Sequence, residues 1–317
     1  MYSCIYVHVT YLIFRFLPVG FFFCLVQGAA QPDIIRFERL SDEEGLPSNL
    51  FSEVIQDEHG LMWMAGLDGL ARYDGYTVKS YRHNHLDTTS ISGNNITALY
   101  ADSKGRLWLG ITGVGLNVSD DAKSVFYKIE IPPGYMDKVP LRIIDITEDS
   151  TGRMWIASDA GLYMVNKRGN DFLVEPYRSN HTKNFSTSFF SKPYVLTTDT
   201  KGRIWIGTAE GLAMIDIQRD KIYGPADFSG LPPVAIQDIE FDRIGRLWVS
   251  CPGQATRLFF TSPDHWQFKA FSNIPFVSAT RNLQFTFDLD NRLWLLYLGI
   301  RHTVTISGTL PYFCRVP

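Results

Sequence analysis

Cysteine is scarce in this sequence, which limits the ways in which it can be cross-linked or bind metal. Among 317 residues there are 4 cysteines, and Cys4 and Cys24 lie in an apolar N-terminal stretch. The other two, Cys251 and Cys314, are too few for a disulfide framework, and no CxxC or Cys/His cluster indicates zinc. A single Cys251–Cys314 disulfide and two free thiols both remain open.

Basic and acidic residues are nearly balanced in number. The sequence has 30 Lys and Arg against 33 Asp and Glu, a formal net charge of -3. Its basic residues form no run that could follow a phosphate backbone, so we expect no nucleic-acid partner. With 45% hydrophobic and 20% charged residues, the composition is that of a globular protein.

The common catalytic motifs are missing as well. We find no GxSxG, no HExxH and no phosphate-binding glycine loop. His83 and His85 form an HNH sequence that could place two imidazoles on one face, but a third ligand is lacking, which favours a solvated loop over a metal site. The sequence therefore predicts no metal, no cofactor and no enzyme activity.

The first thirty residues differ from the rest. Residues 11–30, YLIFRFLPVGFFFCLVQGAA, are apolar, nearly uncharged and end in small residues. This pattern predicts a secretory signal over residues 1–30, cleaved between Ala30 and Gln31, with an uncleaved N-terminal membrane anchor as the alternative. Residues 31–317 would then be one periplasmic or secreted domain, touching a membrane only through the N-terminal segment.

One short pattern, DxxGxxW, recurs along the chain. DSKGRLWLG is preceded by DEHGLMWMAG and followed by close relatives such as DSTGRMWIAS and DTKGRIWIGT. Between successive tryptophans the steps are 45, 47, 50, 43 and 46 residues. The acidic and aromatic members of the six copies are Asp57, Trp63, Asp102, Trp108, Asp149, Trp155, Asp199, Trp205, Asp242, Trp248, Asp288 and Trp294.

The residues around each copy indicate strands rather than helices. A β-rich run precedes the Asp, a second is centred on the Trp, a third follows a glycine-containing turn, and a fourth often follows that. Four short strands about every 45 residues predict an all-β fold, a β-propeller of about six four-stranded blades over residues 31–317. Residues 34–40 could complete the last blade and remove a free sheet edge. An incomplete seven-bladed propeller also fits.

Structural roles can explain the residues that recur in each repeat. Asp can accept hydrogen bonds from amides two or three residues later, and Gly can supply the positive φ of a tight hairpin. The Trp ring can cover the surface between adjacent blades while its indole N–H reaches a carbonyl. These twelve Asp and Trp residues are therefore predicted to build the fold.

The repeat, together with GLPSNLFSEVIQDEHG and SISGNNITALYADSKG, resembles the two-component regulator propeller family over roughly residues 33–297. The resemblance implies the periplasmic sensor half of a membrane-bound regulator, commonly a hybrid histidine kinase or a diguanylate cyclase, many of which respond to carbohydrate fragments. Residues 298–317 are too few for an output domain, so the sequence itself is not expected to produce the signal and could be a fragment of a longer protein.

Streptogramin lyases, which are also propellers, offer a different interpretation. Their repeat is closer to GxLWFTE, and the lyase activity depends on a late His/Glu/His cluster with a metal. The last third of the present chain has only His265 and His302, without that spacing. A propeller lyase is accordingly disfavoured.

Three carboxylates recur at one position of the repeat. Four residues before the Asp stand Glu53, Asp145 and Asp238 in repeats one, three and five. Because the first strand of a blade usually lines the central channel, and unpaired charge inside a core is costly, these groups are expected to face water or a ligand. They could bind a cation or a polyhydroxy ligand, or be a hydrogen-bonded lining of the channel.

The longest connection, residues 178–194, mixes polar residues with aromatic ones. Phe185, Phe189, Phe190 and Tyr194 would suit sugar stacking or a protein interface if exposed, or could fold inward as a cap. The sequence thus predicts a noncatalytic, extracytoplasmic ligand-recognition propeller whose partner is a carbohydrate or other small ligand. The alternative is a scaffold propeller that binds another protein or a second copy of itself.

Overall fold

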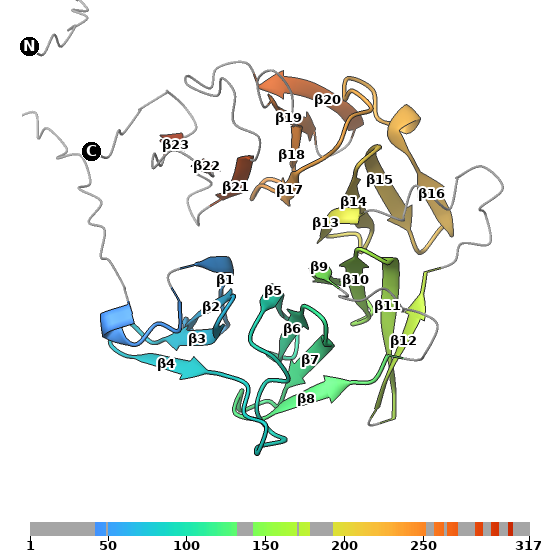
Figure 1. Cartoon of the computed structure of the whole chain (residues 1–317). Helices are drawn as coiled ribbons and strands as arrows, with labels where there is room; N and C mark the ends of the chain where they lie inside the picture. Colours follow the sequence, from blue (N-terminus) through green and yellow to red (C-terminus); the bar gives the residue numbers. More distant parts are fainter. Residues whose placement is uncertain are drawn as a thin grey trace, which may run out of the picture. The chain divides into compact units, whose positions relative to one another are not determined.

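The computed structural model is built almost entirely of short antiparallel strands (Figure 1). Within the described part of the chain the only helices are two three-residue 3-10 turns, Asp42–Glu44 and Pro225–Asp227. The all-β class predicted from the sequence is confirmed. The structure describes residues 42–48, 50–131, 142–169, 171–177, 193–251, 257–262, 265–271, 283–287, 293–297 and 304–306.

Each sequence repeat forms one sheet in which consecutive strands pair with each other. Five sheets have four strands and the sixth has three among the described residues. We call them blades 1 to 6. Blades 1 to 3 comprise β1 (Phe51–Gln56), β2 (Met62–Gly66), β3 (Gly69–Tyr73), β4 (Val78–Tyr81); β5 (Ile96–Ala101), β6 (Leu107–Ile111), β7 (Gly115–Ser119), β8 (Phe126–Ile129); and β9 (Ile143–Glu148), β10 (Met154–Ser158), β11 (Gly161–Arg168), β12 (Asp171–Pro176).

The remaining blades follow the same plan. Blades 4 to 6 comprise β13 (Pro193–Thr198), β14 (Ile204–Thr208), β15 (Gly211–Asp216), β16 (Lys221–Tyr223); β17 (Asp238–Phe241), β18 (Leu247–Cys251), β19 (Arg257–Ser262), β20 (His265–Phe271); and β21 (Leu283–Phe287), β22 (Leu293–Tyr297), β23 (Val304–Ile306). In Figure 1 the first strand of each blade lies innermost, and successive first strands contact one another from β1 to β21. The propeller predicted from the repeat is therefore confirmed.

Two hairpins shape each of blades 1 to 4, and glycine is required in both. Between first and second strands the repeat glycine has positive φ, as at Gly105 (77°). Between second and third strands Gly69 has φ 126°, and a Cβ there would collide with the carbonyl oxygen of Tyr81 on β4. Only glycine fits such a conformation without strain.

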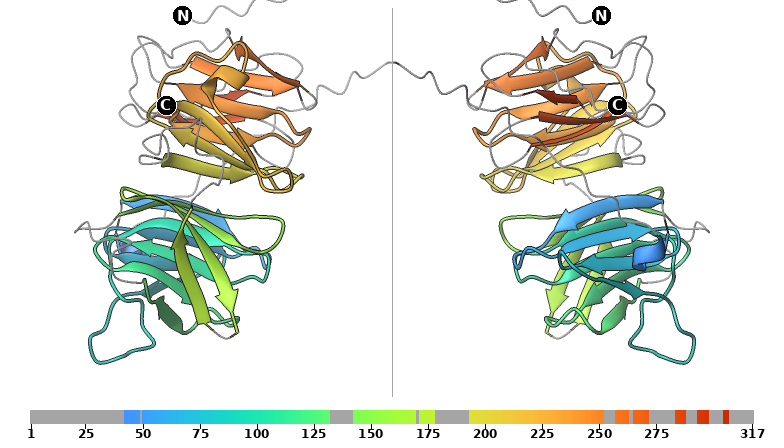
Figure 2. Two further views of the ribbon diagram at one scale, coloured as in Figure 1. Left: turned by 90° about the vertical axis from the view of Figure 1, so that its right-hand side faces the viewer. Right: turned by 90° about the vertical axis from the view of Figure 1, so that its left-hand side faces the viewer.

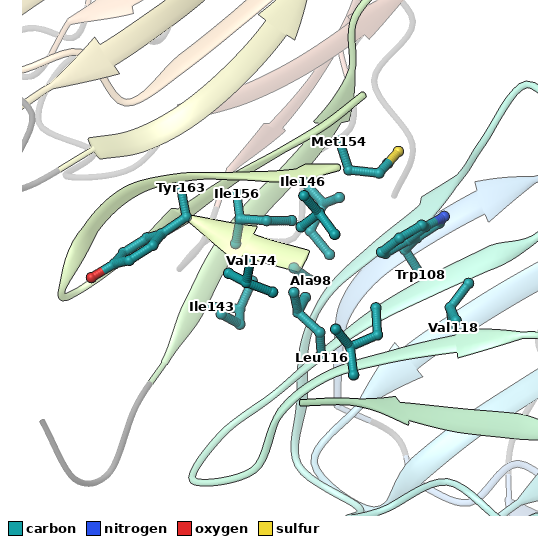
Figure 3. Packing of buried hydrophobic residues seen from close by; sticks show 12 residues of the cluster. Ala98, Trp108, Leu116, Val118, Ile143, Ile146, Met154, Ile156, Tyr163 and Val174 are labelled. Atoms are coloured by element: carbon teal, nitrogen blue, oxygen red, sulfur yellow. The ribbon is translucent and has the colours of Figure 1, made fainter. Parts of the chain in front are cut away.

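The core consists of seams between neighbouring blades, because each inner strand turns alternate side chains to the blade before and the blade after. Figure 3 shows the seam between blades 2 and 3, where Trp108 and Leu116 of blade 2 pack against Ile146, Met154 and Ile156 of blade 3. In the side views of Figure 2 the strands of blade 1 (blue) lie beside those of blade 2 (teal). The tryptophan covers the next blade, as predicted.

Blade 1 differs from its neighbours on the face that would receive a preceding blade. The residue three before the repeat Asp is buried in blade 2, where Leu99 is 2% exposed, but its counterpart Val54 in blade 1 is 50% exposed. Leu46, from the segment before β1, covers Met64 and Ala71 on the same blade. The predicted closing strand, residues 34–40, lies outside the described residues, so closure stays a prediction.

A search of the described residues found no helix that is long and apolar enough to cross a bilayer. The predicted signal or anchor over residues 1–30 lies outside the described residues, and so does Cys314. Cys251 lies in β18 as a buried free thiol, and burial raises its pKa to about 12.

Candidate functional site

The repeat Asp is the centre of the first hairpin turn. One carboxylate oxygen of Asp102, Oδ1, accepts the backbone N–H groups of Lys104 (3.0 Å) and Arg106 (2.9 Å). The other, Oδ2, accepts the indole N–H of Trp108 (2.9 Å) and an N–H of the Arg106 guanidinium (2.8 Å). One carboxylate thus holds the turn, the tryptophan and the arginine in one geometry.

The same pattern is present in every described copy. The indole N–H donates to the repeat Asp at 2.8 to 3.1 Å, which corrects our expectation that it would reach a carbonyl. A carboxylate is the better acceptor, because hydrogen bonds to charged groups are stronger than those between neutral groups. Asp288 and the side chain of Trp294 lie outside the described residues.

In blade 1 a lysine replaces the arginine. Repeat one has Leu61 where the others have Arg, and Lys123 of blade 2 reaches across the seam to Asp57 Oδ2 (3.0 Å) and Glu58 Oε1 (3.1 Å). The lysine side chain is only 5% exposed. This residue was missed from the sequence because 66 residues separate it from Asp57.

These hydrogen bonds outweigh the effect of burial on the turn carboxylates. Burial alone would raise the pKa of Asp102, but the bonds from Trp108 and Arg106 hold it below its usual value. For Asp57 the bonds from Trp63 and Lys123 likewise overcome burial and lower the pKa. Asp57 and Asp102 are therefore charged groups whose carboxylate oxygens are occupied by hydrogen bonds within the protein.

The three carboxylates predicted at the channel have a different set of partners. Glu53 accepts the backbone N–H of Leu99 in blade 2 at 2.6 Å. Asp145 accepts that of Leu196 in blade 4 at 2.6 Å, and Asp238 accepts that of Phe285 in blade 6 at 2.8 Å. Each therefore links its own blade to the next, so that these bonds join blades 1 and 2, 3 and 4, and 5 and 6.

The channel carboxylates accept hydrogen bonds from backbone N–H groups, and their pKa values move upward. Burial, with the charge of Asp145 as the second cause, raises the pKa of Glu53 to about 8 against the hydrogen bond from Leu99. Burial raises the pKa of Asp145 to about 7, and the charge of Asp238 adds to it. Asp238 itself is raised to about 7 by burial. All three side chains nevertheless remain partly accessible to solvent.

These groups line one cavity of about 490 Å³, bounded by the inner strands of blades 1 to 5. Glu240, two residues beyond Asp238, also lines it, and burial raises its pKa to about 7. We missed Glu240 from the sequence, although the two-residue period of a strand places it on the same face as Asp238. Tyr100, Glu148 and three threonines, Thr147, Thr197 and Thr198, add further polar groups to the lining.

A carboxyl with a pKa near neutrality can serve a ligand in two ways. Its protonated form donates one O–H and still accepts, whereas the ionised form only accepts. Among the described residues no group of three His, Cys, Asp or Glu side chains is arranged to hold a metal ion. The cavity is therefore chemically suited to hydroxyl-bearing ligands.

The other candidate residues are only partly described. Tyr194 lies at the start of β13 and is 41% exposed, two residues from the Leu196 amide that Asp145 binds. Phe185, Phe189 and Phe190 lie outside the described residues. His83 and His85 do come together, with Nε2 and Nδ1 3.1 Å apart.

Comparison with known proteins identifies the repeat. The two-component regulator propeller profile matches residues 90–113, which run from the loop before β5 into the turn after β6. Over 77 residues the chain is 35% identical to histidine kinase P4 of Formosa agariphila. That match covers 24% of this chain and 6% of the kinase.

Solved structures with the same fold include a signalling domain and an enzyme. The extracellular domain of BT4673 from B. thetaiotaomicron, described as a one-component or hybrid two-component system, superposes with a TM-score of 0.65 at 19% identity, covering 85% of this chain and 36% of that domain. Virginiamycin B lyase from Staphylococcus aureus superposes with a TM-score of 0.61 at 13% identity, covering 83% of each chain. At such identities the superpositions establish the propeller fold alone.

Proposed function

We propose that this chain, which carries a two-component regulator propeller repeat, is a noncatalytic sensor propeller that recognises a small ligand outside the cytoplasm. The observation that carries the proposal is the profile match at residues 90–113. The similarity to a histidine kinase over 77 residues agrees with it. Because the chain spans only 6% of that kinase, the signalling activity of the whole protein is part of the proposal.

The channel cavity is the recognition site in this proposal. Glu53, Asp145 and Asp238 would exchange hydrogen bonds with ligand hydroxyls, and their raised pKa values let each act as donor or acceptor near neutral pH. Tyr194 offers an exposed ring at the start of β13, where a sugar ring could stack. A hydroxyl-rich ligand, such as an oligosaccharide, fits this combination.

A thermal-shift screen with neutral trisaccharides, for example xylotriose, maltotriose and laminaritriose, tests the proposal. At least one sugar should raise the melting temperature of the chain, because a ligand that binds only the folded state stabilises it. Calorimetry on that sugar should then show binding about tenfold weaker in Tyr194→Ala and in Asp238→Asn, a loss of ~1.4 kcal/mol each.

A matched control keeps the result specific. Tyr194 adjoins Val195 of the cavity lining, whereas Tyr76 is 94% exposed between β3 and β4 with no neighbour in the chain that lines the cavity, so Tyr76→Ala should bind the sugar like the parent. Equal weakening by both tyrosine variants would contradict a site at the channel. A screen without any binder would contradict sugar recognition and favour the alternative, a propeller whose surface binds another protein.

A further inference from the structure

A second cavity, which shares only Thr198 with the lining of the channel cavity, lies in the seam between blades 4 and 5. It has a volume of about 430 Å³. The first-hairpin turns of the two blades form its walls, and Trp205 of blade 4 and Trp266 on β20 of blade 5 contribute its aromatic surface. Their ring centroids are 6.1 Å apart and the rings are nearly perpendicular, at 88°. We call this cavity the seam cleft.

The corresponding turns are bridged at the first two seams of the propeller. Between blades 2 and 3, Ser103 donates its N–H and its hydroxyl to the carboxylate of Glu148, at 2.6 and 2.8 Å. Between blades 1 and 2, Glu58 lies directly against Gly105 and binds Lys123. In both seams a glutamate carboxylate therefore joins the two neighbouring turns.

At the seam cleft the residues in those two positions cannot bridge it. Thr200 stands where blade 2 has Ser103, and Phe241 stands where blade 3 has Glu148. A phenyl ring has neither an acceptor oxygen nor an N–H, so no hydrogen bond can form between these side chains. The two turns therefore stay unbridged by these side chains at the seam cleft, because the sequence places Phe241 where blade 3 has Glu148.

The cleft presents an aromatic surface beside cationic groups. The Arg203 guanidinium lies 5.4 Å from the ring centre of Trp266 and 5.7 Å from that of Trp205. Asp199 takes up its Nε–H, which leaves further N–H groups on the guanidinium for another acceptor. Lys201 is exposed and lines the same cleft.

Because of this combination, we propose that the seam cleft binds a small organic acid that carries a ring. The ring lies against the Trp266 indole, and the carboxylate is held by Lys201 and the free N–H groups of Arg203. Arginine suits the carboxylate because its planar fork matches the two oxygens. The exposed Thr200 hydroxyl of the lining can serve a polar group on the ring. Sugar acids and aromatic acids share this chemistry.

Four probes separate the contributions of ring and charge. Glucuronate and benzoate carry both, glucose has only a ring, and acetate has only a carboxylate. Titrations followed by tryptophan fluorescence and by calorimetry should show at least one of the first two binding about tenfold or more tightly than glucose and acetate. Preference between glucuronate and benzoate then identifies which class of acid the cleft takes. If neither acid binds more tightly than acetate and glucose, the proposal is wrong.

Variants at matched positions test where the acid binds. Lys201→Ala should weaken binding about tenfold, whereas Lys104→Ala should not, because Lys104 is the exposed lysine at the same turn position in blade 2, which does not line the cleft. Thr200→Glu should abolish binding by placing a carboxylate beside Arg203. Melting temperatures of all three variants should match the parent, since the substituted side chains are exposed.

Two results would overturn the assignment. One is equal weakening by Lys201→Ala and Lys104→Ala, which would indicate diffuse surface attraction. The other is undiminished binding in folded Thr200→Glu. The channel proposal is tested separately. Asp238→Asn should weaken sugar binding at the channel but leave acid binding at the seam cleft unchanged.

Discussion

Acidic side chains occupy two regions of the propeller, the first hairpin turns and the channel, and they differ in what compensates their burial. Asp102 in the turn has a guanidinium and an indole N–H on one oxygen, and its pKa is lowered. Asp145 in the channel accepts only backbone N–H groups, and its pKa is raised to about 7. The bonds from the Trp108 indole and from the Arg106 guanidinium lower the pKa of Asp102, whereas only backbone N–H groups oppose the burial of Asp145. Burial sets the cost of a charge, and the partner decides whether the group keeps it.

The largest expected effect is at the turn. Asp102→Ala leaves the Arg106 guanidinium, the Trp108 indole N–H and two backbone N–H groups without their acceptor. Removing one member of a buried ion pair costs about 3–5 kcal/mol, so urea unfolding at pH 7 should show a loss of that order. Asp145→Asn, which keeps an acceptor for Leu196, should lose less than about 1 kcal/mol. Equal losses of unfolding free energy in Asp102→Ala and Asp145→Asn would contradict this difference between the turn and the channel.

A smaller loss is expected where the cation is supplied from the neighbouring blade. Lys123→Met preserves the length of the side chain but removes the ammonium from Asp57, and we expect urea unfolding to show a loss of about 2 kcal/mol. Arg219, whose side chain is largely exposed in its pair with Asp216, provides the control. Arg219→Met should be indistinguishable from the parent, because exposed pairs contribute little. A null result at Lys123 would mean that Asp57 needs no cation.

The channel carboxylates make stability depend on pH in the opposite direction to the turn. The folded pKa of Asp145 and of Asp238 is about 7, above the ordinary value of 3.8, so between these values the folded state keeps protons that the unfolded state has released. Stability should therefore fall as pH rises from about 5 to 8, by roughly 1–2 kcal/mol after allowance for partial exposure. In the double variant Asp145→Asn/Asp238→Asn, the free energy of unfolding measured with urea should change less with pH than in the parent. An unchanged profile in that variant would refute the assignment.

The smallest effect concerns the coupling between channel groups. Because the charge of Asp145 contributes to the raised pKa of Glu53, Asp145→Asn should lower the titration midpoint of Glu53. Carboxyl carbon NMR can follow this midpoint, and a shift of a few tenths of a unit is expected for a secondary cause. Asp121→Asn, an exposed change outside the cavity, should leave it in place. Equal shifts in both variants would indicate a general charge effect.

Local patterns explain what the sequence could predict. The turn needs only residues within seven positions of one another, so the motif DxxGxxW was enough to assign Asp, Gly and Trp to a hairpin. Counting back along the strand from Asp149 and Asp242 also located Asp145 and Asp238 on the channel face, because the strand period is two. The fold and the position of the candidate site follow from repeated short-range constraints of this kind.

Contacts between blades were beyond such reasoning. The bond from Leu196 to Asp145 depends on the offset between two inner strands, and a register irregularity precedes the bonded position in β13. Lys123 reaches Asp57 from another repeat, and no pattern in either repeat indicates the pairing. The seam cleft depends on the place of Trp266 beside Trp205, which is set by the packing of β20.

The carboxylates occur in every second blade, and this alternation also bears on how blades could be gained or lost in evolution. Glu53, Asp145 and Asp238 are each separated by one blade that lacks an acid at that position. Loss of a single acid-free blade would put two acids in adjacent blades, where like charges repel more strongly at shorter distance. Gain or loss of two blades together would keep the spacing. In evolutionary terms, the heritable unit that this channel tolerates best is a pair of blades, twice the length of the visible repeat.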